Sequence, residues 1–150
     1  MKTNRSILLI AFLSFLLFYS TTSHSKVMKT LQETFALSDT VTEMFKDNFL
    51  IEAFDLLERF WPLPKNEVDV LKEKSVKMMN TISDRYGDAI DYSLVRNEAI
   101  SDIASRHTYL IRYENHAIRL LFTFYRNDKG WILNSFKWDD SFEQEFRDVE

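Results

Sequence analysis

The chain has no cysteine and only two glycines and two prolines among its 150 residues. Without cysteine it can form no disulfide, no thiolate metal site and no cysteine nucleophile. With so little glycine and proline it has no Gly/Ser/Pro linker, no Gly-rich phosphate loop and no Gly-x-Ser-x-Gly nucleophile elbow. The fold must therefore rest on a hydrophobic core, for which 13 Phe, 6 Tyr and 3 Trp supply the side chains.

The N-terminus has the layout of a secretory signal. Lys2 and Arg5 precede an apolar run over residues 7–19, and small polar residues continue to Ser25. A bilayer-spanning helix needs about 20 apolar residues, so the shorter run favours a cleavable signal over a retained anchor. We expect residues 1–25 to be removed by a cut between Ser25 and Lys26, which predicts a periplasmic or secreted protein that meets the membrane only during export.

Residues 26–150 have a length that suits one domain. They carry 17 basic and 23 acidic side chains, a net charge of −6. Such a charge disfavours binding to nucleic acid or to anionic lipid, because both attract basic surfaces.

The first half of this region shows the 3.6-residue period of helices. One long helix or two short ones are expected over residues 31–46, since Thr40 and Glu43 could form an internal capping box. A second helix should end at the prolines of residues 61–64, and a third should begin near Asn66 and stop at Gly87. The apolar stripe expected on the third helix consists of Val68, Leu71, Met78, Met79 and Ile82.

The second half alternates with a period of two from Ala89 onward, which predicts strands. A tight turn at Asn115-His116 would pair residues 107–113 with residues 118–124 and gather one apolar face. This register places Arg112 opposite Arg119. A further turn at residues 127–130 uses Gly130 in the left-handed conformation, and a loop of three residues with a bulge, or of four, leads into the last strand. Ser141 and Gln144 could cap a short final helix.

Helices followed by an antiparallel meander predict an α+β fold, with N-terminal helices packed on a curved antiparallel sheet. Residues 109–125 and 130–136 resemble the last hairpins of the nuclear transport factor two-like superfamily, in secreted bacterial members without a known function. The resemblance implies a cone-shaped half-barrel with a cavity. The superfamily includes dehydratases, isomerases and epoxide hydrolases, and members that only bind or dimerise. The acid–base constellations of those enzymes do not match this sequence residue by residue.

Several side chains are candidates for a site. His107 and Tyr109 could act as a cavity acid or base, or His107 could be a hydrogen-bonded structural residue. Arg112 and Arg119 could grip an anion or pair with nearby carboxylates. Asp139 and Asp140 lack the further oxygen ligands that calcium needs, so no metal and no cofactor is expected. The side chains expected to line a ligand site are Tyr92, His107, Tyr109, Arg112, Phe122 and Asn134.

These observations favour an exported, non-catalytic domain that binds a small apolar ligand or a protein partner. Two alternatives stay open. One is a small-molecule lyase or isomerase that uses His107 and Tyr109, and the other is a structural homodimer built on the sheet. The identity of the ligand or partner is not encoded in any motif.

Overall fold

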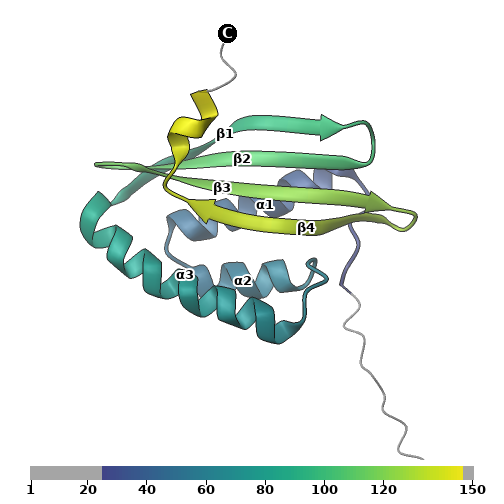
Figure 1. Ribbon diagram of the computed structural model, residues 1–150, viewed down its shortest axis with the longest axis horizontal. Helices are drawn as coiled ribbons and strands as arrows, with labels where there is room; N and C mark the ends of the chain where they lie inside the picture. Colours follow the sequence, from purple (N-terminus) through teal and green to yellow (C-terminus); the bar gives the residue numbers. More distant parts are fainter. Residues whose placement is uncertain (1–24, 147–150) are drawn as a thin grey trace, which may run out of the picture.

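The computed structural model describes residues 25–146, so the expected signal segment lies outside the described residues except for Ser25. Three helices precede one four-stranded antiparallel sheet of strand order β1-β2-β3-β4, which confirms the α+β prediction (Figure 1). Within the described residues, no helix has the length and apolar character needed to cross a bilayer. The elements are α1 (Leu31–Lys46), α2 (Leu50–Glu58), α3 (Lys65–Tyr86), β1 (Ala89–Ile100), β2 (Ala104–Tyr113), β3 (Ala117–Asn127), β4 (Gly130–Asp139) and the 3-10 helix η1 (Phe142–Phe146).

The first helix is continuous, and its cap lies before it rather than inside it. Thr30 has an extended backbone and its hydroxyl accepts a hydrogen bond from the backbone N–H of Glu33. The Glu33 carboxylate in turn accepts from the backbone N–H of Lys29 at 3.0 Å. The alternative of two helices divided at Thr40 is therefore wrong, because Thr40 lies exposed in the middle of α1.

The helix boundaries follow the residues with special backbone geometry. Asn48 has a φ of 62° and separates α1 from α2, a conformation that Asn tolerates better than most residues. The third helix starts at Lys65, and Pro64 is its N-cap residue. The prediction that Asn66 caps this helix is therefore wrong. Gly87 ends α3 with a φ of 78°, which confirms the predicted stop.

The hairpin between β2 and β3 turns one residue earlier than predicted. Tyr113 donates its backbone N–H to the carbonyl of His116, so Glu114 and Asn115 form the two-residue loop. Ile111 then pairs with Ile118, a shift of two residues from the expected register. A shift of two leaves every side chain on its predicted face, because side chains alternate with a period of two. The shift does separate the two arginines: Arg112 pairs with Ala117, and Arg119 pairs with Leu110.

The β3–β4 loop is also shorter than either predicted alternative. Asn127 pairs with Gly130 across a two-residue loop, and the Asn127 side chain accepts from the backbone N–H groups of Lys129 and Gly130. Gly130 has a φ of 138°, outside the left-handed helical region that we expected. The bulge lies farther along β4, where Asn134 is the extra residue between the pairs Phe124–Leu133 and Thr123–Ser135.

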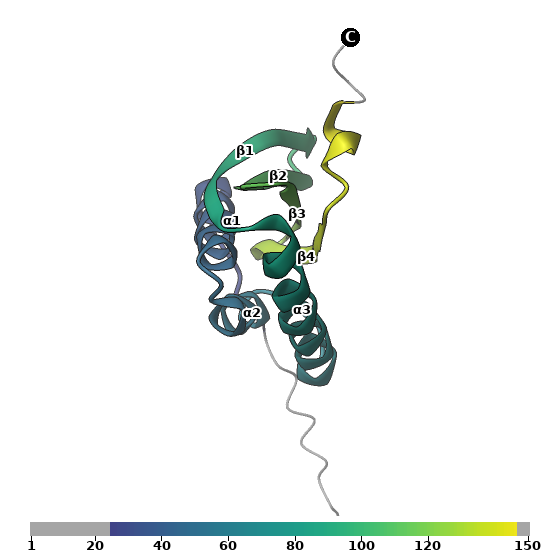
Figure 2. The same cartoon turned by 90° about the vertical axis from the view of Figure 1, so that its left-hand side faces the viewer.

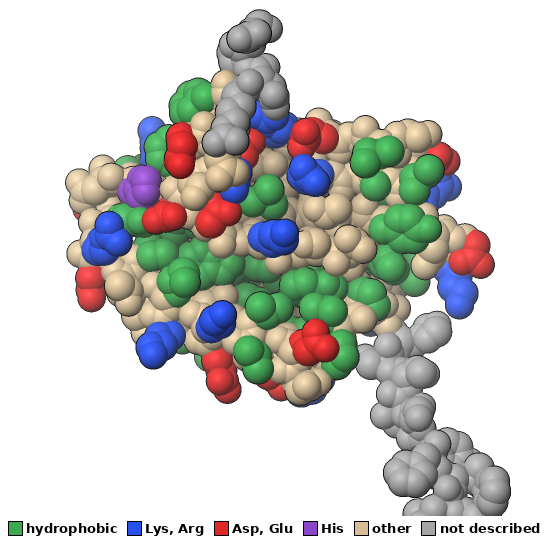
Figure 3. Space-filling view, in the orientation of Figure 1, with side chains coloured by type: hydrophobic (Ala, Val, Ile, Leu, Met, Phe, Trp, Pro, Cys, Tyr) green, Lys and Arg blue, Asp and Glu red, His purple; other side chains and the backbone are tan. Residues whose placement is uncertain are grey.

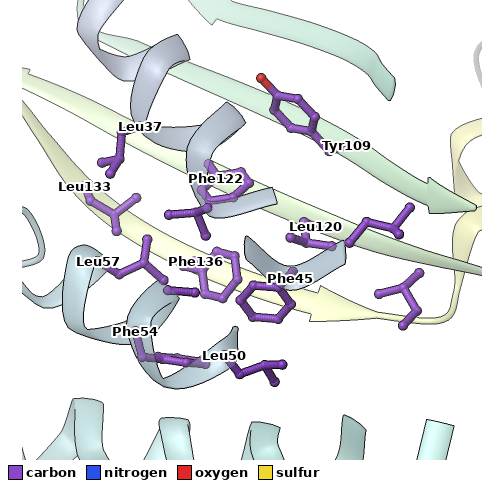
Figure 4. Packing of buried hydrophobic residues seen from close by; sticks show 14 of the residues in the cluster. Leu37, Phe45, Leu50, Phe54, Leu57, Tyr109, Leu120, Phe122, Leu133 and Phe136 are labelled. Atoms are coloured by element: carbon purple, nitrogen blue, oxygen red, sulfur yellow. The ribbon is translucent and has the colours of Figure 1, made fainter. Parts of the chain in front are cut away.

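The helices cover one face of the sheet, and β1 curves over toward α1 (Figure 2). Figure 4 shows side chains from α1, α2, β3 and β4 pointing toward one another in the space between the layers. Phe45, Phe54, Phe122 and Phe136 form its centre, with ring centroids 5.0–6.0 Å apart in tilted or edge-on pairs. Burying each such side chain contributes roughly 1.5–3 kcal/mol, so this cluster is a main source of stability.

Candidate functional site

His107 lies on the helix-facing side of β2 and is completely buried. Its Nδ1 is 2.9 Å from the hydroxyl of Ser38 on α1, and its Nε2 is 3.1 Å from the hydroxyl of Ser105. The imidazole stacks on the ring of Phe35, with 3.9 Å between centroids. Ser38 donates to the carbonyl of Thr34 at 2.9 Å. Because a hydroxyl has one proton, Ser38 then accepts from Nδ1–H, and Nε2 accepts from Ser105.

Burial lowers the pKa of His107 to about 4, because the charged imidazolium loses its hydration. The side chain is therefore neutral at pH 7, and both ring nitrogens are used by serines. A general acid or base must lie within hydrogen-bond reach of the substrate atom that gives or receives the proton. The contacts around His107 are those of a satisfied structural histidine.

Tyr92 and Tyr109 lie next to each other on the same side of the sheet, with ring centroids 6.2 Å apart. Burial, followed by the carboxylate of Asp39, raises the pKa of Tyr92 to about 12. Burial also raises the pKa of Tyr109, and its hydrogen bond with Ser38 opposes part of that rise. Both phenols therefore remain protonated at neutral pH. The structure brings Tyr92 and Tyr109 together, and of these two only Tyr92 retains appreciable exposure.

The cone interior where a ligand was expected is filled by the core. Phe122 is completely buried, and its ring is 5.0 Å from Phe136 and 5.9 Å from Tyr109. A ligand could enter here only by displacing packed aromatic rings, which removes contacts that stabilise the fold. Phe122 is consequently a core residue in this structure.

The last two candidates lie away from the interior. Arg112 is exposed and makes two hydrogen bonds with the carboxylate of Asp91, at 2.6 and 2.9 Å. Asn134 is exposed at the β4 bulge, where its backbone carbonyl accepts from the indole N–H of Trp61. Neither side chain lines the pocket between α1 and the sheet to which Tyr109 belongs.

A groove between α3 and β4 has the features that the cone interior lacks. It has a volume of about 330 Å³ and is lined chiefly by the apolar side chains of Phe54, Leu71, Met78, Phe136 and Trp138. Figure 3 shows hydrophobic side chains gathered in a band along this boundary between the sheet and the helices. Small-molecule sites are apolar clefts of about this size with a few polar groups.

Leu71 and Met78 line this groove although the sequence assigned them to the core stripe of α3. They are 38% and 52% exposed, whereas Val68, Met79 and Ile82 are buried. Ser75 lies between them along the helix, and its hydroxyl accepts from the indole N–H of Trp138 at 2.8 Å. The sequence pattern did not separate these two residues from the buried residues of the same helix.

Two lysines, Lys74 and Lys137, stand at the rim of the groove beside Asp139. Asp139 is bound to Arg119, so its charge is neutralised. Neither lysine takes part in an ion pair with any residue in 25–146. The rim therefore presents positive charge next to an apolar floor.

The two aspartates considered as cation ligands are both engaged by other groups. Asp139 accepts two hydrogen bonds from Arg119, and Asp140 accepts one from the Tyr86 hydroxyl at 2.7 Å. No group of three or more His, Asp or Glu side chains suited to a metal ion occurs in the part of the chain that the structure describes. Comparison of the chain with protein-family models, curated proteins and solved structures finds no match.

Proposed function

We propose that this chain is an exported, non-catalytic domain that binds a small amphipathic anion in the groove between α3 and β4. The ligand has an apolar body and one negatively charged end. The proposal keeps the expectation of an apolar ligand and moves its site from the cone interior to the groove. The element order supports a cone of the nuclear transport factor two-like type, and residues 1–25 support export.

The observation that carries the proposal is the exposure of Leu71 and Met78 beside Trp138. Leaving large apolar side chains in contact with water forfeits roughly 1.5–3 kcal/mol for each side chain that could be fully buried. A hydrocarbon chain in the groove would recover part of this free energy. The lysines at the rim then favour a carboxylate head over a neutral one.

Titration with decanoate and with decanol by calorimetry tests this assignment. Decanoate is expected to bind saturably. Decanol should bind more weakly, because it has no carboxylate to interact with Lys74. Met78→Asn should weaken decanoate binding by about fivefold, which corresponds to roughly 1 kcal/mol. The matched control is Val70→Asn, since Val70 is 59% exposed on the same helix but outside the groove.

Three outcomes would count against the proposal. The first is that neither probe binds, and the second is that Met78→Asn and Val70→Asn weaken decanoate binding equally. The third is a concentration-dependent mass in light scattering that Met78→Asn abolishes, which would make the groove a surface for self-association. Lys74→Gln separates charge from apolar contact, because it should weaken decanoate and leave decanol unchanged.

A further inference from the structure

The face of the sheet opposite the helices carries a second, polar groove of about 780 Å³. It is crossed by η1, which follows β4 and lies in front of the sheet in Figure 1. Side chains from all four strands line the groove, among them four basic residues: Arg96, Arg106, Arg119 and Lys137. Three acidic residues accompany them: Glu98, Asp139 and Glu145. Most of the other lining groups are hydroxyls and amides.

Two arginines from different strands converge on the single carboxylate of Glu145. Arg96 on β1 places its Nε 3.1 Å from Glu145 Oε2, and Arg119 on β3 places its Nη1 2.8 Å from Oε1. Arg96 also donates through Nη2 to the backbone carbonyl of Glu145 at 2.7 Å. Two guanidiniums around one carboxylate form a strong, directional anion site.

Among residues 25–146, few other contacts hold the segment that supplies this carboxylate. No residue of η1 is buried, and Phe146 is 68% exposed. Besides the Glu145 contacts, Gln144 accepts from Arg119 at 3.1 Å, and the ring of Phe142 is 5.4 Å from that of His116. Attachment of η1 therefore depends mainly on charged hydrogen bonds, which are weakened by salt.

Arg119 would keep its position if Glu145 left. The Asp139 carboxylate accepts from Nε and Nη2 of Arg119 at 3.1 and 2.8 Å, and Arg119 is only 7% exposed. Nη1 would then be a nearly buried donor without its carboxylate, a costly state that another anion can relieve. Without Glu145, the groove would still be lined by four basic and two acidic side chains.

We infer that this groove is a binding site for a small hydroxylated polycarboxylate, and that Glu145 occupies the anion position as an internal competitor. One carboxylate of the ligand replaces that of Glu145 between Arg96 and Arg119. A second carboxylate faces Lys137, and the hydroxyls of Thr108, Thr123 and Ser135 with the Asn134 amide match a polar ligand body. The sequence suggested Arg112 and Arg119 as the pair that binds an anion. The site inferred here keeps Arg119 and replaces Arg112 with Arg96.

Citrate is a suitable probe, because it carries three carboxylates and one hydroxyl. The test is calorimetric titration of citrate into the full chain and its variants at low ionic strength. Glu145→Gln is expected to bind citrate about tenfold more tightly than the unaltered chain, since the apparent affinity rises as the occupied fraction of the site falls. Glu143→Gln is the matched control: this residue lies in the same segment, is exposed, and does not line the groove.

Adding Arg96→Gln to Glu145→Gln should lower citrate affinity by at least about tenfold, because it removes one of the two guanidiniums. Arg96 is not part of the core, so far-UV circular dichroism should remain that of the unaltered chain. The inference is overturned if Glu145→Gln and Glu143→Gln bind citrate equally, or if Glu145→Gln binds none at millimolar concentration. Met78→Asn should leave citrate binding unchanged, which separates this groove from the apolar one.

Discussion

The imidazole of His107 lies nearly parallel to the ring of Phe35, with 3.9 Å between centroids and 12° between planes. This stack fastens α1 to β2 at a point where both ring nitrogens of His107 already have serine partners. The arrangement favours the neutral imidazole, because the ring is completely buried between neutral hydroxyls and the imidazolium would lose its hydration there.

Protonation of His107 should therefore destabilise the fold. The pKa is about 4 in the folded chain and about 6.5 in the unfolded chain, so between these values the unfolded state binds more protons. The free energy of unfolding should consequently fall as the pH drops from 6.5 toward 4, by about 3 kcal/mol in total.

Urea denaturation from pH 7 to pH 4 measures this effect, with His107→Gln as the variant that cannot titrate. The difference in unfolding free energy between the two proteins should shrink as the pH falls. An NMR titration that gives His107 a pKa of 6 or higher would contradict the assigned contacts.

Two phenylalanine variants test whether the cone interior is filled by packed side chains. Phe122→Ala should lower the free energy of unfolding by about 3–5 kcal/mol, because it opens a cavity among packed rings. Phe49→Ala should cost less than about 1 kcal/mol, since Phe49 is 55% exposed. Similar losses in the two variants, measured by chemical denaturation, would show that the interior is not packed as described.

The position of the α1 cap can be tested in the same way. Thr30→Ala removes the acceptor for the Glu33 N–H and should cost about 1 kcal/mol. Thr40→Ala, in the exposed middle of α1, should be neutral or slightly stabilising because alanine has the higher helix propensity. If Thr40→Ala were the more costly change, the helix would have to be divided there after all.

Gly130 permits the N-terminal segment to pair with β4. A Cβ at this position would meet the backbone carbonyl of Met28 and would be 2.7 Å from Val27 Cγ1, and the φ of 138° is one that L side chains rarely adopt. Gly130→Ala should cost about 2–4 kcal/mol by combining backbone strain with this clash.

The same substitution should speed hydrogen exchange at the Met28 amide, which donates to the carbonyl of Trp131 at 2.8 Å. Asp128→Ala, in the same loop and exposed, serves as the control and should change stability by less than about 0.5 kcal/mol. Unchanged exchange at Met28 in Gly130→Ala would mean that this pairing does not hold in solution.

The sequence predicted the faces of the sheet better than its register. His107, Tyr109, Phe122 and Phe124 were placed on one face and all four are buried there. The hydrophobic pattern cannot distinguish a register from one shifted by two residues, because both give the same faces. Contacts outside the hairpin favour the observed register. Asn115 donates its backbone N–H to the carbonyl of Tyr86, which holds the turn at Glu114-Asn115.

Neither groove could be derived from local patterns. The contact between Arg96 and Glu145 joins residues far apart in the chain, and its geometry depends on the path of η1 across the sheet. Likewise, the helical period of α3 predicts that Leu71 and Met78 face the sheet. It does not show whether the sheet is wide enough to cover them. Expectations about residue type were therefore useful, whereas expectations about which residues meet required the three-dimensional fold.

The most direct test of the proposed function is to map decanoate binding residue by residue with amide chemical shifts of the isotopically labelled chain. We expect saturable shifts at Leu71, Ser75, Met78 and Trp138, and none at His107 or Tyr109. Shifts centred on His107, Tyr109 and Phe122 would instead place the ligand in the cone interior and contradict the account.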